Sequence, residues 1–142
     1  MTTSTSEIKV KGSTGLNIGL WVAQVVLAVM FGFGGAMKAT APMPELVEQM
    51  GWPGALPEGL VRFIGVSELL GAIGLVLPSL TRIKPALTPL AAAGLVVVMV
   101  LAALFHIPRG ELGALPFNIG LGAAAAFIAW GRWKAAPIAP RA

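Results

Sequence analysis

Charged residues are scarce in this chain of 142 residues, and hydrophobic ones dominate it. Only 11% of the positions are charged, against about 25% in a typical soluble domain, whereas 56% are hydrophobic. A chain of this length has too little interior to bury so many apolar side chains. The composition therefore excludes a water-soluble monomer, and it excludes a disordered chain, which requires low hydrophobicity. The class that remains is an integral membrane protein.

Cysteine and aspartate are absent, and His106 is the single histidine. Without cysteine the chain forms no disulfides and no cysteine-ligated zinc or iron–sulfur centres. Without aspartate it has no Ser-His-Asp triad. His106 with Glu68 and Glu111 gives at most three metal ligands, in none of the usual metal-binding spacings. We therefore predict no catalytic residue and no metal site.

Four long apolar runs follow one another along the chain. They cover roughly residues 16–37, 60–80, 87–107 and 113–131. A helix needs about 20 residues to cross the ~30 Å hydrocarbon core of a bilayer. A barrel would need short strands of alternating hydrophobicity, which the sequence does not contain. The predicted fold is an all-α membrane protein with four transmembrane helices packed as a bundle.

The distribution of lysine and arginine predicts the orientation of the protein in the membrane. Three basic residues, Lys38, Arg62 and Arg109, fall on one side of the predicted spans. The other seven fall on the opposite side: Lys9, Lys11, Arg82, Lys84, Arg132, Lys134 and Arg141. Because cytoplasmic loops carry the excess of positive charge, we expect both termini in the cytoplasm and the protein in the inner (plasma) membrane. The net charge of +4 then reflects topology and contact with anionic lipids, and no nucleic-acid partner is needed to explain it.

A single transmembrane domain is expected over 15–134, between a disordered cytoplasmic segment (1–14) and a cytoplasmic tail (135–142). The first apolar run is longer than the core of a signal peptide, so we expect it to be retained. In the outer loop, 39–59, a leading proline and a trailing glycine predict a short helix from Pro44 to Gly51. This helix either lies flat on the membrane or covers a pocket.

Four polar residues stand within the apolar runs or at their ends: Lys38, Glu68, His106 and Asn118. In the predicted orientation all four lie in the outer half of the membrane, and each shares its helix face with small residues. Polar side chains in spans usually face the bundle interior, so we expect one cluster between the helices. The rim of a pocket there would include Trp52, Arg62 and Arg109. Asn17, Gln24 and Phe31 precede Lys38 along the first span at a spacing of seven residues.

The cluster has two interpretations. In one, Glu68 pairs with Lys38, Arg62 or His106 only to hold the helices in register. Removing one partner of such a buried pair costs about 3–5 kcal/mol. In the other, the cluster binds a ligand or handles a proton, as intramembrane acids often do. The residue pattern does not decide between them.

Five segments carry a family resemblance through their order and spacing: FGFGGAMK (31–38), RFIGVSELLGAIGLVLP (62–78), TPLAAAGL (88–95), FHIPRGE (105–111) and AWGR (129–132). Together they resemble the DoxX-like family of small four-helix membrane proteins, over roughly residues 20–132. The polar positions typical of that family match Lys38, Glu68, His106 and Asn118.

The resemblance implies that this protein functions together with other proteins. The family is named after subunits similar to those of an archaeal thiosulfate:quinone oxidoreductase, other members resemble membrane partners of soluble redox enzymes, and distant animal relatives include a receptor-assembly chaperone. We therefore expect an accessory subunit, not an enzyme on its own, that docks a redox partner and holds a quinone or lipid. The alternatives are a structural or chaperone-like module and a small oligomeric transporter. Small-residue faces also permit a homo-oligomer.

Overall fold

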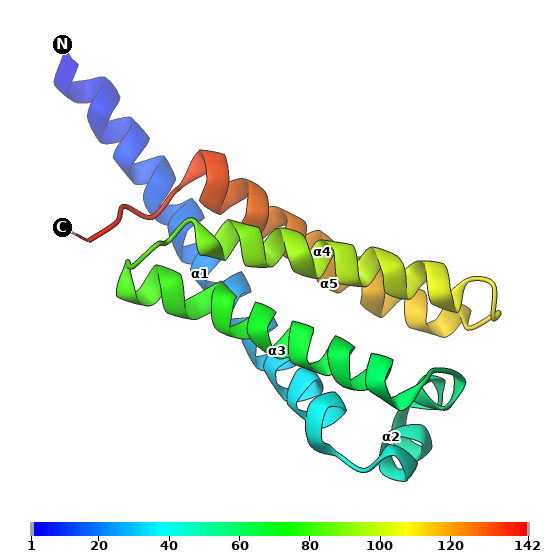
Figure 1. Cartoon of the computed structure of the whole chain (residues 1–142). Helices are drawn as coiled ribbons and strands as arrows, with labels where there is room; N and C mark the ends of the chain where they lie inside the picture. Colours follow the sequence, from blue (N-terminus) through cyan, green and yellow to red (C-terminus); the bar gives the residue numbers. More distant parts are fainter. Residues whose placement is uncertain (1, 142) are drawn as a thin grey trace.

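The computed structural model describes residues 2–141, with side chains from Thr14 onward, and that part of the chain is helical without a strand (Figure 1). Its elements are α1 (Thr2–Thr40), α2 (Met43–Met50), the 3-10 turn η1 (Trp52–Ala55), α3 (Glu58–Thr81), α4 (Leu87–His106), the 3-10 turn η2 (Leu112–Ala114), α5 (Leu115–Trp130) and the π-helical turn η3 (Gly131–Ala135).

Four segments are long and apolar enough to span a membrane: Thr14–Thr40, Glu58–Thr81, Leu87–His106 and Leu112–Ala135. The predicted all-α fold with four spans is therefore confirmed. The short helix expected in the loop is confirmed as α2, which has a proline in its first turn and is followed by Gly51 with φ of 75°.

α1 extends into the first segment of the chain. It begins at Thr2, within the residues 1–14 for which disorder was expected. Extending an existing helix adds one hydrogen bond per residue and avoids the costly first turn, so a long apolar helix can carry polar residues at its end. The expectation of disorder at Met1 lies outside the described residues.

The helices form two pairs. α1 lies against α3 and α5 against α4, and contacts between α3 and α4 join the pairs. Figure 1 shows the pairs spreading apart toward the end that carries α2. Buried apolar side chains such as Leu27, Leu75 and Ile128 form the core. Large apolar side chains such as Phe33 and Phe63 remain exposed, which suits a surface that faces lipid.

α1 and α3 touch where Gly35 faces Gly65. A Cβ atom on Gly35 would lie 2.7 Å from the carbonyl oxygen of Gly65, and a Cβ atom on Gly65 would lie 2.7 Å from the carbonyl carbon of Lys38. Only glycine permits so close an approach of two backbones. Lys38 and Glu68 each follow the glycine of their own helix by three residues, about one turn. The contact therefore brings these two side chains together.

Pro78 lies inside α3 without ending it. Because proline has no N–H, the carbonyl of Gly74, four residues earlier, lacks its usual helical donor. The hydroxyl of Thr88, from the first turn of α4, donates to that carbonyl at 3.0 Å, and Ser79 Oγ lies 2.7 Å from Thr88 Oγ1. These bonds join α3 to α4 at the end of the bundle away from α2.

Candidate ligand site

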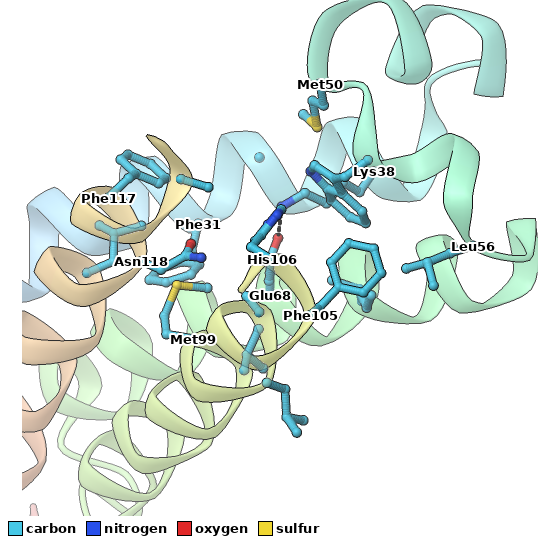
Figure 2. A pocket seen from close by; sticks show the side chains of 18 of the residues that line it. Phe31, Lys38, Met50, Leu56, Glu68, Met99, Phe105, His106, Phe117 and Asn118 are labelled. Atoms are coloured by element: carbon cyan, nitrogen blue, oxygen red, sulfur yellow. Dashed lines mark hydrogen bonds and ion pairs between the residues drawn. The ribbon is translucent and has the colours of Figure 1, made fainter. Parts of the chain in front are cut away.

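A cavity of about 1400 Å³ lies between the two helix pairs at the α2 end. All five α-helices contribute to its wall, which is mostly apolar. The lining side chains labelled in Figure 2 include Phe31, Met50, Leu56, Met99, Phe105 and Phe117. This space is larger than the ~300–1,000 Å³ that small-molecule sites in proteins usually enclose. Its size and its apolar wall suit a molecule with a long apolar part.

Lys38 and Glu68 form an ion pair in the cavity wall. Lys38 Nζ lies 2.6 Å from Glu68 Oε2, and the Glu68 side chain is only 4% exposed. The lysine ammonium also lies 5.7 Å from the centre of the Trp52 ring. Of the three partners that the sequence left open for Glu68, the structure pairs it with Lys38.

His106 is held by a turn that follows α4. Gly110, with φ of 71°, lets the chain reverse, and the backbone N–H of Glu111 donates to the His106 carbonyl at 3.1 Å. His106 Nδ1 lies 2.6 Å from Glu111 Oε2. A carboxylate only accepts hydrogen bonds, so Nδ1 donates to Glu111 and the contact fixes the orientation of the ring.

Glu111 also binds Arg109, whose Nε lies 2.5 Å from Glu111 Oε1. The hydrogen bond from His106, and after it the one from Arg109, hold the pKa of Glu111 below its usual value. Glu111 therefore remains a carboxylate that orients His106. From the sequence, Glu111 was considered as a metal ligand, and its role in positioning His106 was missed. The signal was the short spacing HIPRGE with a glycine before the acid.

Asn118 lies in the cavity wall near the start of α5, after a proline in the first turn. Its side chain is buried, and Nδ2 is fully enclosed with no hydrogen-bond partner in the described part of the chain. In Figure 2 Asn118 lies with Phe31, Met99 and Phe117, whereas the Lys38–Glu68 pair lies toward the end that carries Met50. Buried polar groups in proteins are nearly always hydrogen-bonded, so this amide stands out.

An aromatic cluster covers the α2 end of the cavity. The ring centre of Trp52 lies 6.3 Å from that of Phe105 and 6.5 Å from that of His106, both edge-on. The Arg109 guanidinium lies 4.9 Å from the Phe105 ring centre. Trp52 and Arg109, two of the three residues expected at the rim, both line the cavity. Met50 at the end of α2 lines it as well, so the α2 segment contributes to the cavity wall.

Arg62, the third residue expected at the rim, has a different position. It is not among the described residues that line the cavity. Its Nη1 donates to the carbonyls of Lys38 and Ala41, at 3.1 and 2.5 Å, and its Nη2 to Glu58 Oε1 at 3.0 Å. Arg62 therefore satisfies two carbonyls at the end of α1, those of Lys38 and Ala41, and in doing so it fixes the backbone of Lys38.

A second polar cluster, around Arg132, lies at the opposite end of the bundle. Arg132 is buried, and its Nε and Nη1 donate to Gln24 Oε1 and Asn17 Oδ1 at 2.6 and 2.5 Å. Gln24 Nε2 in turn donates to the Leu75 carbonyl at 2.6 Å. From the sequence, Arg132 was a charge that sets topology and part of the AWGR segment, and its contacts with Asn17 and Gln24 were not predicted. The seven-residue spacing of Asn17 and Gln24 was the available signal.

The cavity's donor set does not suit a metal ion. Among the side chains that the structure describes, no three His, Cys, Asp or Glu lie close enough together to hold one. The wall instead offers an ion pair, an enclosed amide donor and an imidazole on an apolar surface. Such a combination recognises a mostly apolar molecule that carries a few polar atoms.

A sequence profile of the DoxX-like family matches residues 22–128. The chain belongs to the DoxX-like family. No curated protein and no solved structure matches it. The matched range of this DoxX-like protein contains Lys38, Glu68, His106 and Asn118, whereas Arg132 lies beyond it. Family and fold together make the chain a multi-pass integral membrane protein.

Proposed function

We propose that this DoxX-like protein is an accessory membrane subunit that holds a quinone- or lipid-sized molecule in the cavity between the α1–α3 and α4–α5 pairs. The observation that carries the proposal is the cavity of about 1400 Å³, apolar over most of its wall and containing Lys38, Glu68, His106 and Asn118. A purely structural cluster has no need for such a space beside it.

In this proposal the polar residues have separate roles. Glu68 exchanges a proton with the bound molecule or the solvent, and Lys38 stabilises its charged form. His106, oriented by Glu111, and Asn118 hydrogen-bond the polar part of the molecule. The chain has no cysteine and no cofactor motif, so electrons would reach a bound quinone from a docked redox partner.

The proposed orientation has both termini in the cytoplasm and the cavity in the outer half of the inner membrane, because of the distribution of basic residues. Reporter fusions test it. A fluorescent protein on the C-terminus should be fluorescent, and alkaline phosphatase at the same position should be inactive. The reverse pair of results would invert the topology.

The test of the bound molecule is native mass spectrometry of protein extracted gently from its own membranes. Wild type should carry a quinone- or lipid-sized adduct that survives detergent exchange. Ala102→Phe, which fills the cavity, should lose it, whereas Val100→Phe, on the exposed side of the same helix, should keep it. A bare wild-type chain, or one in which both variants behave alike, would reject the proposal. A protein partner retained in the same spectra would support the accessory role.

The second candidate is a structural or chaperone-like module, and the Lys38–Glu68 pair favours it because each charge already has its partner. Under that function Glu68→Gln lowers thermal stability and leaves adducts and partners unchanged. Under the proposed function the same variant also loses the bound molecule.

A further inference from the structure

We infer that the cavity takes an uncharged amphiphile whose head group presents a carbonyl oxygen to Asn118 Nδ2, and that it discriminates against anionic head groups. This inference rests on the proposed function and names the class of molecule that the cavity binds. Three observations lead to it: an unused donor, a wall without net charge and an apolar mouth.

The unused donor is the amide of Asn118. The side chain is 8% exposed and lines the cavity, and its Nδ2 is enclosed without an acceptor among the described residues. A rotation of the side chain must turn Nδ2 toward the cavity before a ligand can reach it. Ser67, in the same wall, shows the contrast, because its hydroxyl already donates to the Phe63 carbonyl at 2.8 Å. A carbonyl oxygen is a compact acceptor that needs no proton of its own, and it matches what Asn118 lacks.

The charges in the wall cancel. Lys38 is paired with Glu68, and Arg109 with Glu111, which also holds His106. Sites for phosphate or carboxylate heads present arginine or lysine side chains that are free to bind them. Here an anionic head would have to displace a carboxylate from its cation and would then lie beside that carboxylate. An uncharged head avoids both costs.

The mouth of the cavity is apolar. Phe33, Phe63 and Leu101 line it and are 71%, 68% and 60% exposed. In a bilayer these side chains face acyl chains, so a molecule with an apolar tail can enter from the membrane. The head then reaches Asn118 while the tail remains among the aromatic and aliphatic side chains.

The test is competition among three probes, separated by mass in native mass spectra of the purified full-length protein. The probes are decylubiquinone and monoolein, which are uncharged and carry quinone and ester carbonyls, and dioleoylphosphatidylglycerol, which is anionic. At equal concentration at least one uncharged probe should bind in preference to the anionic one. Asn118→Leu should bind that probe about tenfold more weakly, the value of one hydrogen bond. The control Thr81→Ala, at the end of α3 away from the cavity, removes a hydroxyl that donates to the Leu77 carbonyl and should bind the probe like wild type.

A probe pair keeps the test independent of the variant's folding. The ether counterpart of monoolein lacks only the carbonyl, so it should bind wild type about tenfold more weakly if monoolein is the preferred probe. Preference for decylubiquinone alone identifies the quinone carbonyl as the acceptor, and preference for monoolein alone identifies the ester.

Two results would overturn the inference: preference for phosphatidylglycerol, or equal binding by wild type and a folded Asn118→Leu. Either result would still be compatible with the proposed function, provided that Ala102→Phe, which fills the cavity, abolishes binding of the probes. Failure of every probe, together with the absence of a native adduct, would reject the proposed function as well.

Discussion

Gly35 on α1 and Gly65 on α3 face each other with no room for a side chain between them, and Lys38 and Glu68 follow them by one turn. Two backbones in contact set the separation of the two charged side chains. The ion pair in the cavity wall is thus a consequence of glycine at two positions. The stability of the bundle and the geometry of the site depend on the same contact.

Gly35→Ala should lower the melting temperature of the purified protein. The added methyl group would lie 2.7 Å from the Gly65 carbonyl oxygen, and such overpacking typically costs about 1–3 kcal/mol. Gly94→Ala is the control, since a Cβ atom there meets nothing within 4 Å. It should leave the melting temperature unchanged or raise it. Equal melting temperatures of the two variants would show that the close helix contact at Gly35 does not determine the stability of the protein.

Lys38→Met and Glu68→Gln should each destabilise the protein by about 3–5 kcal/mol, because each leaves a buried charge without its partner. The double variant should lose much less than the sum of the two. Reversible unfolding in mixed micelles of all four proteins measures the coupling. Additive losses would mean that the two side chains do not interact.

Glu111→Gln should destabilise the protein at neutral pH but not in acid. A carboxyl whose pKa is lowered in the folded state stabilises that state above its ordinary pKa, here 4.5, and the contribution is lost as pH falls through the lowered pKa. The melting temperatures of wild type and variant should therefore converge below pH 4.5. Glu48→Gln, an exposed change on α2, should show no such convergence. A gap that persists at low pH would contradict the role given to Glu111.

Arg132→Lys should lower the melting temperature although it keeps the charge. Arginine donates to Gln24 and Asn17 through separate nitrogens of a rigid fork, which a lysine ammonium cannot reproduce. The loss of buried hydrogen bonds should cost about 1–3 kcal/mol. Lys134→Arg, an exposed exchange two residues later, is the control. Equal melting of Arg132→Lys and wild type would show that charge alone matters at this position.

Much of the fold follows from the sequence because a bilayer imposes a length and an apolar character on each span. The predicted spans agree with the structure to within a few residues, apart from the π-helical end of the last one. The end of α3 was less predictable, since Pro78 is tolerated through a hydroxyl of Thr88 on another helix. Such compensation depends on packing between two helices, which cannot be predicted from the sequence of one helix alone.

The site was predicted in part. Small residues beside Lys38 and Glu68 indicated facing helices, but only the crossing at Gly65 selects Lys38 as the partner. Arg132 was missed because a cation at the end of a span serves topology and packing equally well. That Asn118 lacks an acceptor could not be foreseen, because it depends on every group around it in space.

The most direct test of the central claim is a density map of the protein purified from its own membranes without added ligand. The account predicts an elongated feature in the cavity between α3 and α4, with its polar end within hydrogen-bonding distance of Asn118 Nδ2. A map in which the two helix pairs close on each other, or in which only disordered detergent fills the cavity, would contradict it.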